Sequence, residues 1–196
     1  MIHPDTKILL VNEQVGLGVF ATQFIPAGTI VYVLDQLDII IEHNRDILSN
    51  KVYRDYLDKY AYVDAKGNHI VCWDHGKYVN HSCNPNTLST GYGFEIAIRD
   101  IYPGEEITDD YLLLNATEEM EHYCGDEKCR KKLSLNDFEL LSDKWDAQIK
   151  SSLRNVNKVA QPLWELLDMD TLNNLNLYSD TGERYQSVRN TKYCYQ

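Results

Sequence analysis

Apolar residues near the start of the chain fall in short runs, and glycine or proline turns separate the runs. Such apolar and β-branched runs favour strands, and close spacing between turn residues indicates local hairpins. Residues from about 7 to 41 are therefore predicted to form strands. The runs are residues 8–11, 19–21, 29–33 and 38–41, with turns at 16–18 and 26–28.

The periodicity changes after this region. Apolar side chains at roughly helical spacing, from Ile47 to Tyr60, predict a short helix within residues 44–59. Residues 69–73 form another β-branched and aromatic run, which predicts a strand. Residues 94–99 alternate apolar and charged, the period of a half-buried strand.

Helical spacing returns beyond residue 133. Phe138, Leu141, Trp145 and Ile149 predict an amphipathic helix. Leucines and a tryptophan at 163–167, with a proline at 162 in the first turn, predict a second helix. The polar, tyrosine-rich end from about residue 178 gives no clear prediction.

Composition narrows the class of protein. The chain has 196 residues, 43% hydrophobic and 25% charged, as expected of a globular protein with a sizeable core. Its net charge of −11 argues against binding to a nucleic-acid backbone. The charge suits a basic protein partner through long-range steering, although acidity that serves only solubility is an equal alternative.

The five cysteines are odd in number and sparse, so a disulfide framework is not expected. No apolar run approaches the roughly 20 residues of a membrane span, and the first residues lack the pattern of a signal peptide. These features predict an intracellular protein, cytoplasmic or nuclear.

Two polar segments and one glycine turn contain the residues that indicate a function. The first segment is Asn80-His81-Ser82-Cys83-Asn84-Pro85-Asn86, and the second runs from Gly104-Glu105-Glu106 to Tyr111. Taken singly, the first is a surface loop of turn formers, and Gly16-Leu17-Gly18 is a turn without the third glycine of a dinucleotide site. Together, and in this order, the three segments resemble the signature of the SET-domain family of protein-lysine N-methyltransferases.

The resemblance covers residues 7–133 and implies a mostly β (α+β) fold. Short sheets would enclose a pseudoknot, an exception to the usual absence of knots, and a helical segment would follow. The expected division is a SET domain over 1–116, a post-SET-like segment over 117–133 and a C-terminal helical extension over 134–196.

The same resemblance implies an enzyme that transfers methyl groups from S-adenosylmethionine to lysine in a basic protein, histone-like or ribosomal. It assigns Tyr111 as the catalytic residue, which also contacts the cofactor. Tyr60 and Tyr62 are candidates for the aromatic wall of the lysine channel, although packing on a half-buried strand explains them equally well. The further candidate cofactor-binding residues are Gly16, Leu17, Gly18, Lys77, Asn80, His81 and Tyr123.

The chemistry of methyl transfer explains why a lysine methyltransferase needs these residue types. Methyl transfer needs a neutral amine, and a lysine pKa near 10.4 leaves only about one amine in 2,500 neutral at pH 7. A nearby sulfonium and an apolar aromatic channel both favour loss of the proton. The Tyr111 hydroxyl is expected to orient the amine, because alignment alone contributes several kcal/mol.

The post-SET-like segment keeps the family spacing Cys-x-Cys-x4-Cys, with His122 in place of the first cysteine. With Cys83, the resemblance predicts one structural zinc held by Cys83, His122, Cys124 and Cys129, because zinc accepts mixed Cys/His ligation. A degenerate extension without metal is the alternative.

Asp109 stands where the family usually has Phe or Tyr, beside the substrate amine. A carboxylate there could hold a water, bind the substrate ammonium or point away, so the number of methyl groups added is not predicted. A catalytically weak SET domain that binds basic proteins is the alternative function. The sequence makes no prediction of oligomeric state.

Overall fold

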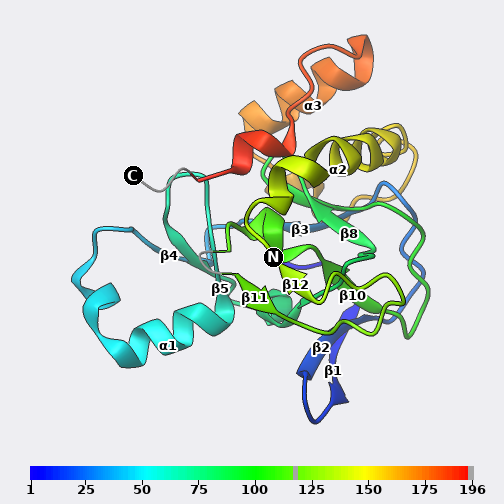
Figure 1. Cartoon of the computed structure of the whole chain (residues 1–196). Helices are drawn as coiled ribbons and strands as arrows, with labels where there is room; N and C mark the ends of the chain where they lie inside the picture. The colour runs from blue at the N-terminus through cyan, green and yellow to red at the C-terminus, as the bar shows by residue number, and fades with distance from the viewer. Residues whose placement is uncertain (117–118, 194–196) are drawn as a thin grey trace.

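The computed structural model describes residues 1–116 and 119–193. The predicted β-rich architecture is confirmed: within these residues, short strands form four small sheets with a helical C-terminal part, as Figure 1 shows. The first sheet contains β1 (Thr6–Asn12), β2 (Gly16–Ala21), β10 (Glu106–Asp109) and β7 (Asn80–His81), in that order.

β10 joins the two signature segments within this sheet. It pairs antiparallel with β2 through Glu106 and Phe20, and parallel with β7 through Thr108 and Asn80. Residues that are far apart in the sequence therefore meet along one strand. The threading of a pseudoknot stays a prediction.

The second sheet carries the main core. It contains β3 (Ile30–Val33), β9 (Phe94–Ala97) and β8 (Thr87–Ser89), with β9 in the centre. The predicted amphipathic helix is confirmed as α2 (Asp137–Leu153), whose Trp145 is 2% exposed. Side chains of this sheet and of α2 belong to one buried cluster, so the C-terminal helices share a core with the sheets.

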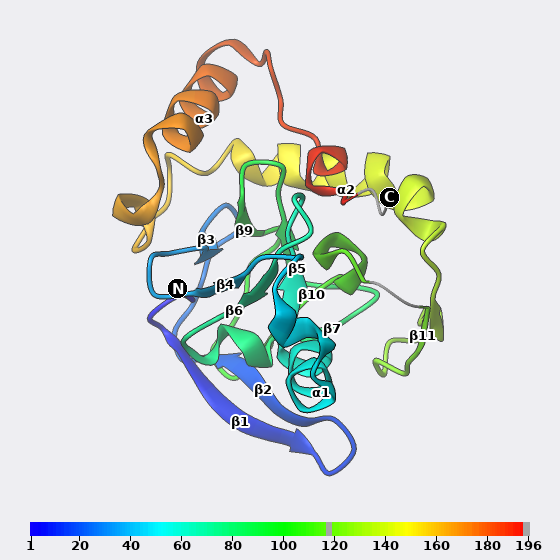
Figure 2. The same ribbon diagram turned by 90° about the vertical axis from the view of Figure 1, so that its left-hand side faces the viewer.

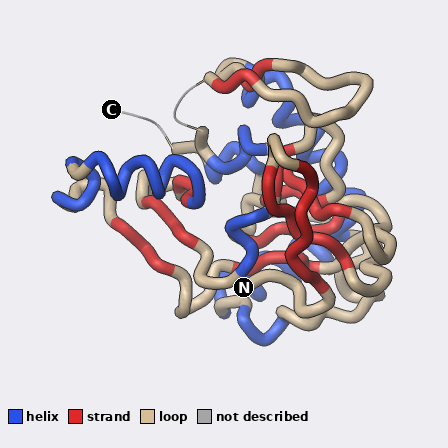
Figure 3. Tube along the Cα trace, turned by 90° about the horizontal axis from the view of Figure 1, so that it is seen from below, coloured by secondary structure: helices blue, strands red, loops and turns tan. Residues whose placement is uncertain are grey.

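The third sheet contains β4 (Ile39–Ile41), β6 (His69–Val71) and β5 (Ala61–Val63). Figure 3 shows α1 (Lys51–Tyr60) beside its strands at the edge of the molecule. The helix predicted within 44–59 is split: a 3-10 turn, Asp46–Ser49, precedes α1. Asn50 is extended and accepts a hydrogen bond from the Val52 N–H, which is why α1 begins after it.

Two further 3-10 turns frame the site, η2 (His75–Tyr78) and η3 (Tyr111–Leu114). The post-SET-like segment forms a small hairpin of β11 (Met120–Glu121) and β12 (Lys132–Leu133). Its predicted start at 117 falls outside the described residues, as does the end of the chain from 194. The division into three parts stays a prediction.

The second predicted C-terminal helix is wrong. Residues 163–167 contain only a 3-10 turn, Trp164–Leu166, and the helix is instead α3 (Met169–Thr181). The Asp168 carboxylate caps its start by accepting from the Thr171 N–H at 2.8 Å, and Gly182 ends it in the left-handed conformation. A short 3-10 turn, η5 (Val188–Thr191), follows.

The C-terminal helices and the first hairpin lie at opposite ends of the molecule. Figure 2 shows α2 and α3 above the sheets and the β1–β2 hairpin below them. Among the described residues, no helix has the length and apolar character needed to cross a lipid bilayer.

Candidate active site

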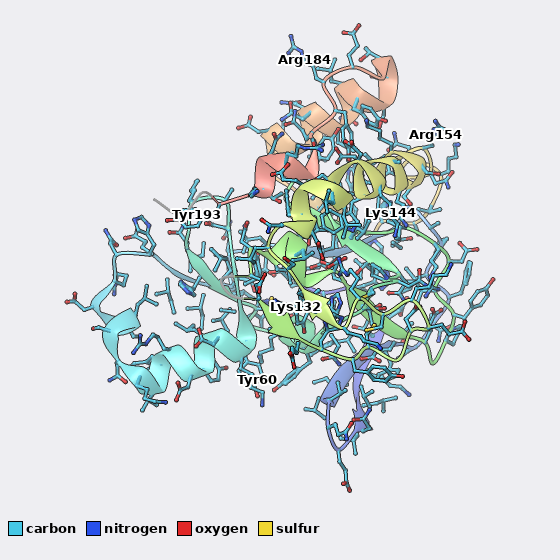
Figure 4. All side chains as sticks on the ribbon, viewed as in Figure 1. Tyr60, Lys132, Lys144, Arg154, Arg184 and Tyr193 are labelled. Atoms are coloured by element: carbon cyan, nitrogen blue, oxygen red, sulfur yellow. The ribbon has the colours of Figure 1, made fainter. Side chains whose placement is uncertain are left out.

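A cavity of about 390 Å³ lies between α1, the third sheet and the end of β10. All the residues predicted for the substrate side line it, namely Tyr60, Tyr62, Asp109 and Tyr111. They come from four different elements, so the fold brings together side chains that the sequence separates by up to 51 positions (111 − 60). In Figure 4, Tyr60 lies at the end of α1 nearest the body of the protein.

Tyr60 and Tyr62 are not alternate residues of one strand. Tyr60 ends α1, and its ring lies 5.8 Å from the ring of Tyr78. Tyr62 is in β5, edge-on to the ring of Tyr32 at 6.4 Å. Both tyrosines line the cavity while they pack against these rings, so their role as the wall of a lysine channel stays a prediction.

Tyr111 lines the cavity as the first residue of η3, one residue beyond Asp110, which follows β10. Its hydroxyl donates to the Val79 carbonyl at 3.0 Å, and its backbone N–H donates to His81 Nδ1 at 3.2 Å. Burial, reinforced by the nearby Asp109 carboxylate, raises the pKa of Tyr111 to about 12. The hydroxyl is therefore protonated at neutral pH, and it can orient a substrate amine but cannot act as a strong base.

Asp109 faces the cavity and is fully buried. Its carboxylate accepts from Ser89 Oγ at 2.8 Å and from the Asp110 N–H at 2.7 Å. Burial raises the pKa of Asp109 well above its usual range, and the charge of Glu95 acts in the same direction.

Glu95 is a second carboxylate on this cavity, and sequence reasoning missed it. It lies in the middle of β9, opposite Tyr32 of β3 and Ser89 of β8. Burial raises its pKa from 4.5 to about 7. Among the described residues, Glu95 Oε2 has no hydrogen-bond partner, although it is shut off from solvent.

The predicted cofactor residues meet on the other side of Tyr111. The Asn80 amide donates to the Leu17 carbonyl at 3.0 Å and to Glu106 Oε1 at 2.8 Å. A Cβ on Gly18 would lie 2.4 Å from that Glu106 oxygen, so only glycine permits this approach. Glu106, which was not predicted, is the charged group nearest this cluster.

This cluster fits the cationic parts of S-adenosylmethionine, because a carboxylate and backbone carbonyls provide negative charge and acceptors. Two other predicted cofactor residues, Lys77 and Tyr123, make no hydrogen bond to this cluster within the described residues. Lys77 Nζ donates to the Asp74 carbonyl at 2.9 Å, within its own turn, and Tyr123 is 74% exposed. The cofactor roles of these residues, and of Gly16, stay predictions.

A sulfur–nitrogen cluster connects the first signature segment with the post-SET-like hairpin. His122 Nε2 lies 3.1 Å from Cys83 Sγ and 3.7 Å from Cys129 Sγ. Ligand atoms of Cys83, His122, Cys124 and His81 all lie within 4.8 Å of one another. Zn–S and Zn–N bonds of about 2.3 and 2.0 Å in a tetrahedron separate ligand atoms by roughly 3.5 Å. The donor set therefore fits zinc, with His81 as an unpredicted fifth candidate.

Arg130 fixes the hairpin to the SET-domain core. Its Nη2 donates to both carboxylate oxygens of Asp110 at 2.8 Å, and its backbone N–H and Nε lie 3.3 and 3.4 Å from Cys83 Sγ. Asp110 is 2% exposed, and burial raises its pKa while the Arg130 charge opposes that shift. The same arginine thus contacts the core and the metal-ligand cluster.

Known proteins resemble the chain over this same region. Histone-lysine N-methyltransferase ASHH3 of Arabidopsis thaliana is 25% identical over 98% of the chain and 54% of its own length. Histone-lysine N-methyltransferase Set2 of Drosophila melanogaster is 32% identical over 61% of the chain and 6% of its own length. The chain thus spans about half the length of the first relative and a small part of the second.

Among solved structures, the methyltransferase domain of human histone-lysine N-methyltransferase SETMAR is similar, with a TM-score of 0.45 and 20% identity. That similarity covers 68% of the chain and 58% of the SETMAR domain structure. The SET domain family model matches residues 16–112, which include all three signature segments and the centre of the cavity. The chain belongs to the SET-domain family.

Proposed function

We propose that this protein is an S-adenosylmethionine-dependent protein-lysine N-methyltransferase. The observation that supports it most is the position of Tyr111, which lines the aromatic cavity and also contacts His81, next to the Asn80 cluster. A substrate lysine would enter the cavity past Tyr60, and the cofactor would bind beside Gly18 and Asn80. Tyr111 would stand between them.

The chain's residues would contribute alignment and desolvation. S-adenosylmethionine supplies an electrophilic methyl group on a sulfonium when it is bound. The walls of the cavity exclude water, and the protonated Tyr111 hydroxyl holds the amine in line for attack. Such alignment accounts for several kcal/mol of the barrier, and no strong general base is required.

The substrate is proposed to be a basic histone tail. A net charge of −11 favours approach of a Lys/Arg-rich segment. The relatives reported above are named as histone-lysine methyltransferases, and their names support the same substrate class. A histone substrate would favour a nuclear location.

One structural zinc is proposed for Cys83, His122, Cys124 and Cys129, with His81 as the alternative fourth ligand. The supporting observation is the clustering of ligand atoms from segments that are 39 residues apart. Metal analysis of protein purified without chelator is expected to find one zinc per chain. Cys124→Ser should lower that content, and a zinc-free wild-type protein would contradict the assignment.

Tyr111→Phe tests the catalytic assignment. Transfer of labelled methyl to purified histones should fall at least about a hundredfold, while calorimetric binding of S-adenosylmethionine stays close to that of the wild type. Tyr102→Phe is the matched control, because Tyr102 is 59% exposed and is not among the residues that line the cavity. Equal turnover in wild type and Tyr111→Phe would contradict the assignment.

The alternative function, a binding module for basic proteins, gives a different result in the same experiment. A wild-type protein that binds histones but transfers no methyl group would favour it. The buried Asp109 in place of an aromatic residue is the observation on its side.

A further inference from the structure

The cavity contains an unused hydrogen-bond acceptor. Glu95 Oε2 has almost no solvent-accessible surface and, within residues 1–116 and 119–193, no hydrogen-bond partner. A buried carboxylate oxygen without a partner is costly, and native proteins fill such acceptors with protein groups, water or a ligand. Glu95 lines the same cavity as Tyr111, so a small shift of its carboxylate would bring Oε2 against a ligand there.

The neighbouring carboxylate has no such vacancy. Asp109 already receives hydrogen bonds from Ser89 and from the Asp110 backbone, one on each oxygen. Both carboxylates nevertheless line this cavity, and the charge of Glu95 adds to burial in raising the pKa of Asp109. Lys77 also lines the cavity, but its Nζ donates to the backbone carbonyls of Asp74 and Cys72. A cationic ligand therefore matches the charge, and a donor matches Oε2.

We propose that Glu95 Oε2 accepts an N–H bond from the ammonium group of the substrate lysine, with Asp109 beside it, so that the cavity prefers unmethylated lysine. This inference rests on the proposed function. Each methyl group already on the amine replaces one N–H donor with an apolar group, so fewer orientations of the ammonium place an N–H against Oε2. Dimethyl-lysine keeps a single N–H, which satisfies this one acceptor in one orientation only, and it is then the poorest ligand that can still react.

The same contact accounts for loss of the lysine proton. An N–H bond of the ammonium breaks and an O–H bond forms on Glu95, so the positive and negative charges disappear together within the cavity. The amine keeps the electron pair that attacks the methyl group of the sulfonium donor. The carboxyl group returns its proton to solvent when the product leaves the cavity.

The test uses small analogues of the lysine side chain, so it does not depend on knowing the substrate. Binding of n-butylammonium, N,N-dimethylbutylammonium and n-butanol to the full chain is measured by NMR titration. The wild type is expected to bind n-butylammonium about tenfold or more tightly than n-butanol, as a charged hydrogen bond implies. N,N-dimethylbutylammonium should bind between the two.

Glu95→Gln should abolish the preference for n-butylammonium and leave n-butanol binding unchanged. Glu119→Gln is the matched control, because Glu119 also lines the cavity but is half-exposed and paired with Lys132. It should keep the wild-type preference. A wild type without the preference, or a Glu95→Gln variant that retains it, would overturn the inference.

The outcome separates this inference from the proposed function. If the protein prefers the ammonium but transfers no methyl group to histones, the result would support the Glu95 site and contradict the proposed methyltransferase function. If methyl transfer depends on Tyr111 but the protein shows no preference for the ammonium, the result would support the methyltransferase function and contradict the Glu95 site. Circular dichroism of Glu95→Gln checks that the variant is folded.

Discussion

Glu95 and Asp146 are two partly or fully buried carboxylates with opposite surroundings. Asp146, on α2, accepts from Tyr185 Oη at 2.9 Å, Ser187 Oγ at 2.6 Å and the Val188 N–H at 2.9 Å. Glu95 Oε2, on β9, accepts from no described residue. A carboxylate with all its acceptors filled holds the fold together, whereas one with a vacant acceptor beside a cavity is available to a ligand. Substitution of Asp146 should therefore lower the free energy of unfolding, whereas substitution of Glu95 should raise it.

The largest effect is expected for a third buried carboxylate, Asp110, whose partner is a cation. Arg130→Ala leaves the Asp110 charge buried and unpaired, which typically costs about 3–5 kcal/mol of unfolding free energy. Urea denaturation measures the change. Arg99→Ala is the control, because its pair with Glu105 is largely exposed and should contribute less than about 1 kcal/mol. A loss no larger than that of Arg99→Ala would contradict the prediction.

Asp146→Ala should lower the unfolding free energy by about 2–4 kcal/mol, because it strands three donors of the C-terminal segment. Asp143→Ala, one turn earlier on α2 and 90% exposed at its side chain, should change it by less than about 0.5 kcal/mol. Thermal or urea unfolding gives both values. Equal losses of unfolding free energy in the two variants would show that the three hydrogen bonds to Asp146 do not stabilise the fold.

Glu95→Gln should raise stability, and the gain should depend on pH. Burial raises the pKa of Glu95 from 4.5 to about 7, so the folded protein binds this proton more tightly than the unfolded chain does. Wild-type stability therefore falls as pH rises from about 4.5 to 7. The variant should lack that loss and gain about 2–3 kcal/mol relative to wild type at pH 8, but little at pH 4.

The measurement is urea denaturation of both proteins between pH 4 and pH 8. A stability difference that stays constant with pH would show that Glu95 is not destabilised by burial. Glu119→Gln serves again as the control, and its change should have the opposite sign: Lys132 lowers the pKa of Glu119, so the wild type gains the stability of this pair as pH rises from 4 and the variant does not.

Ser89→Ala should have the smallest effect. It removes one of two hydrogen bonds to Asp109 and leaves that carboxylate less satisfied, at a cost of about 1 kcal/mol. Urea denaturation near pH 7 measures it. If Ser89→Ala lowers the free energy of unfolding as much as Asp146→Ala does, Asp109 stabilises the fold in the same way as Asp146.

The sequence located the signature segments that the SET domain family model covers, but it misplaced one of the C-terminal helices. Asn80, His81 and Tyr111 lie in short segments of unusual composition, so their positions could be recognised without knowing the fold. The helix α3 was missed because its apolar residues are few, although Asp168 and Gly182 mark its ends. The competing run at 163–167 is apolar but too short to form more than a 3-10 turn.

Glu95 could not be predicted from its own segment. In residues 94–99, alternation with apolar neighbours places its side chain on the other face of the strand, which normally means solvent. Here that face meets the cavity, because Tyr62 and Asp109 come from distant parts of the chain to cover it. The sequence pattern fixes which face a residue occupies, but only tertiary packing determines what lies against that face.

The central place of β10 in the first sheet has a consequence for how the protein folds. β10 lies between β2 and β7, so neither its antiparallel nor its parallel pairing can form until residues 106–109 exist. These contacts span more than 80 residues on one side (106 − 20), and such non-local pairing is slow. A nascent chain on the ribosome would therefore display Gly18 and Asn80 long before it could hold them together.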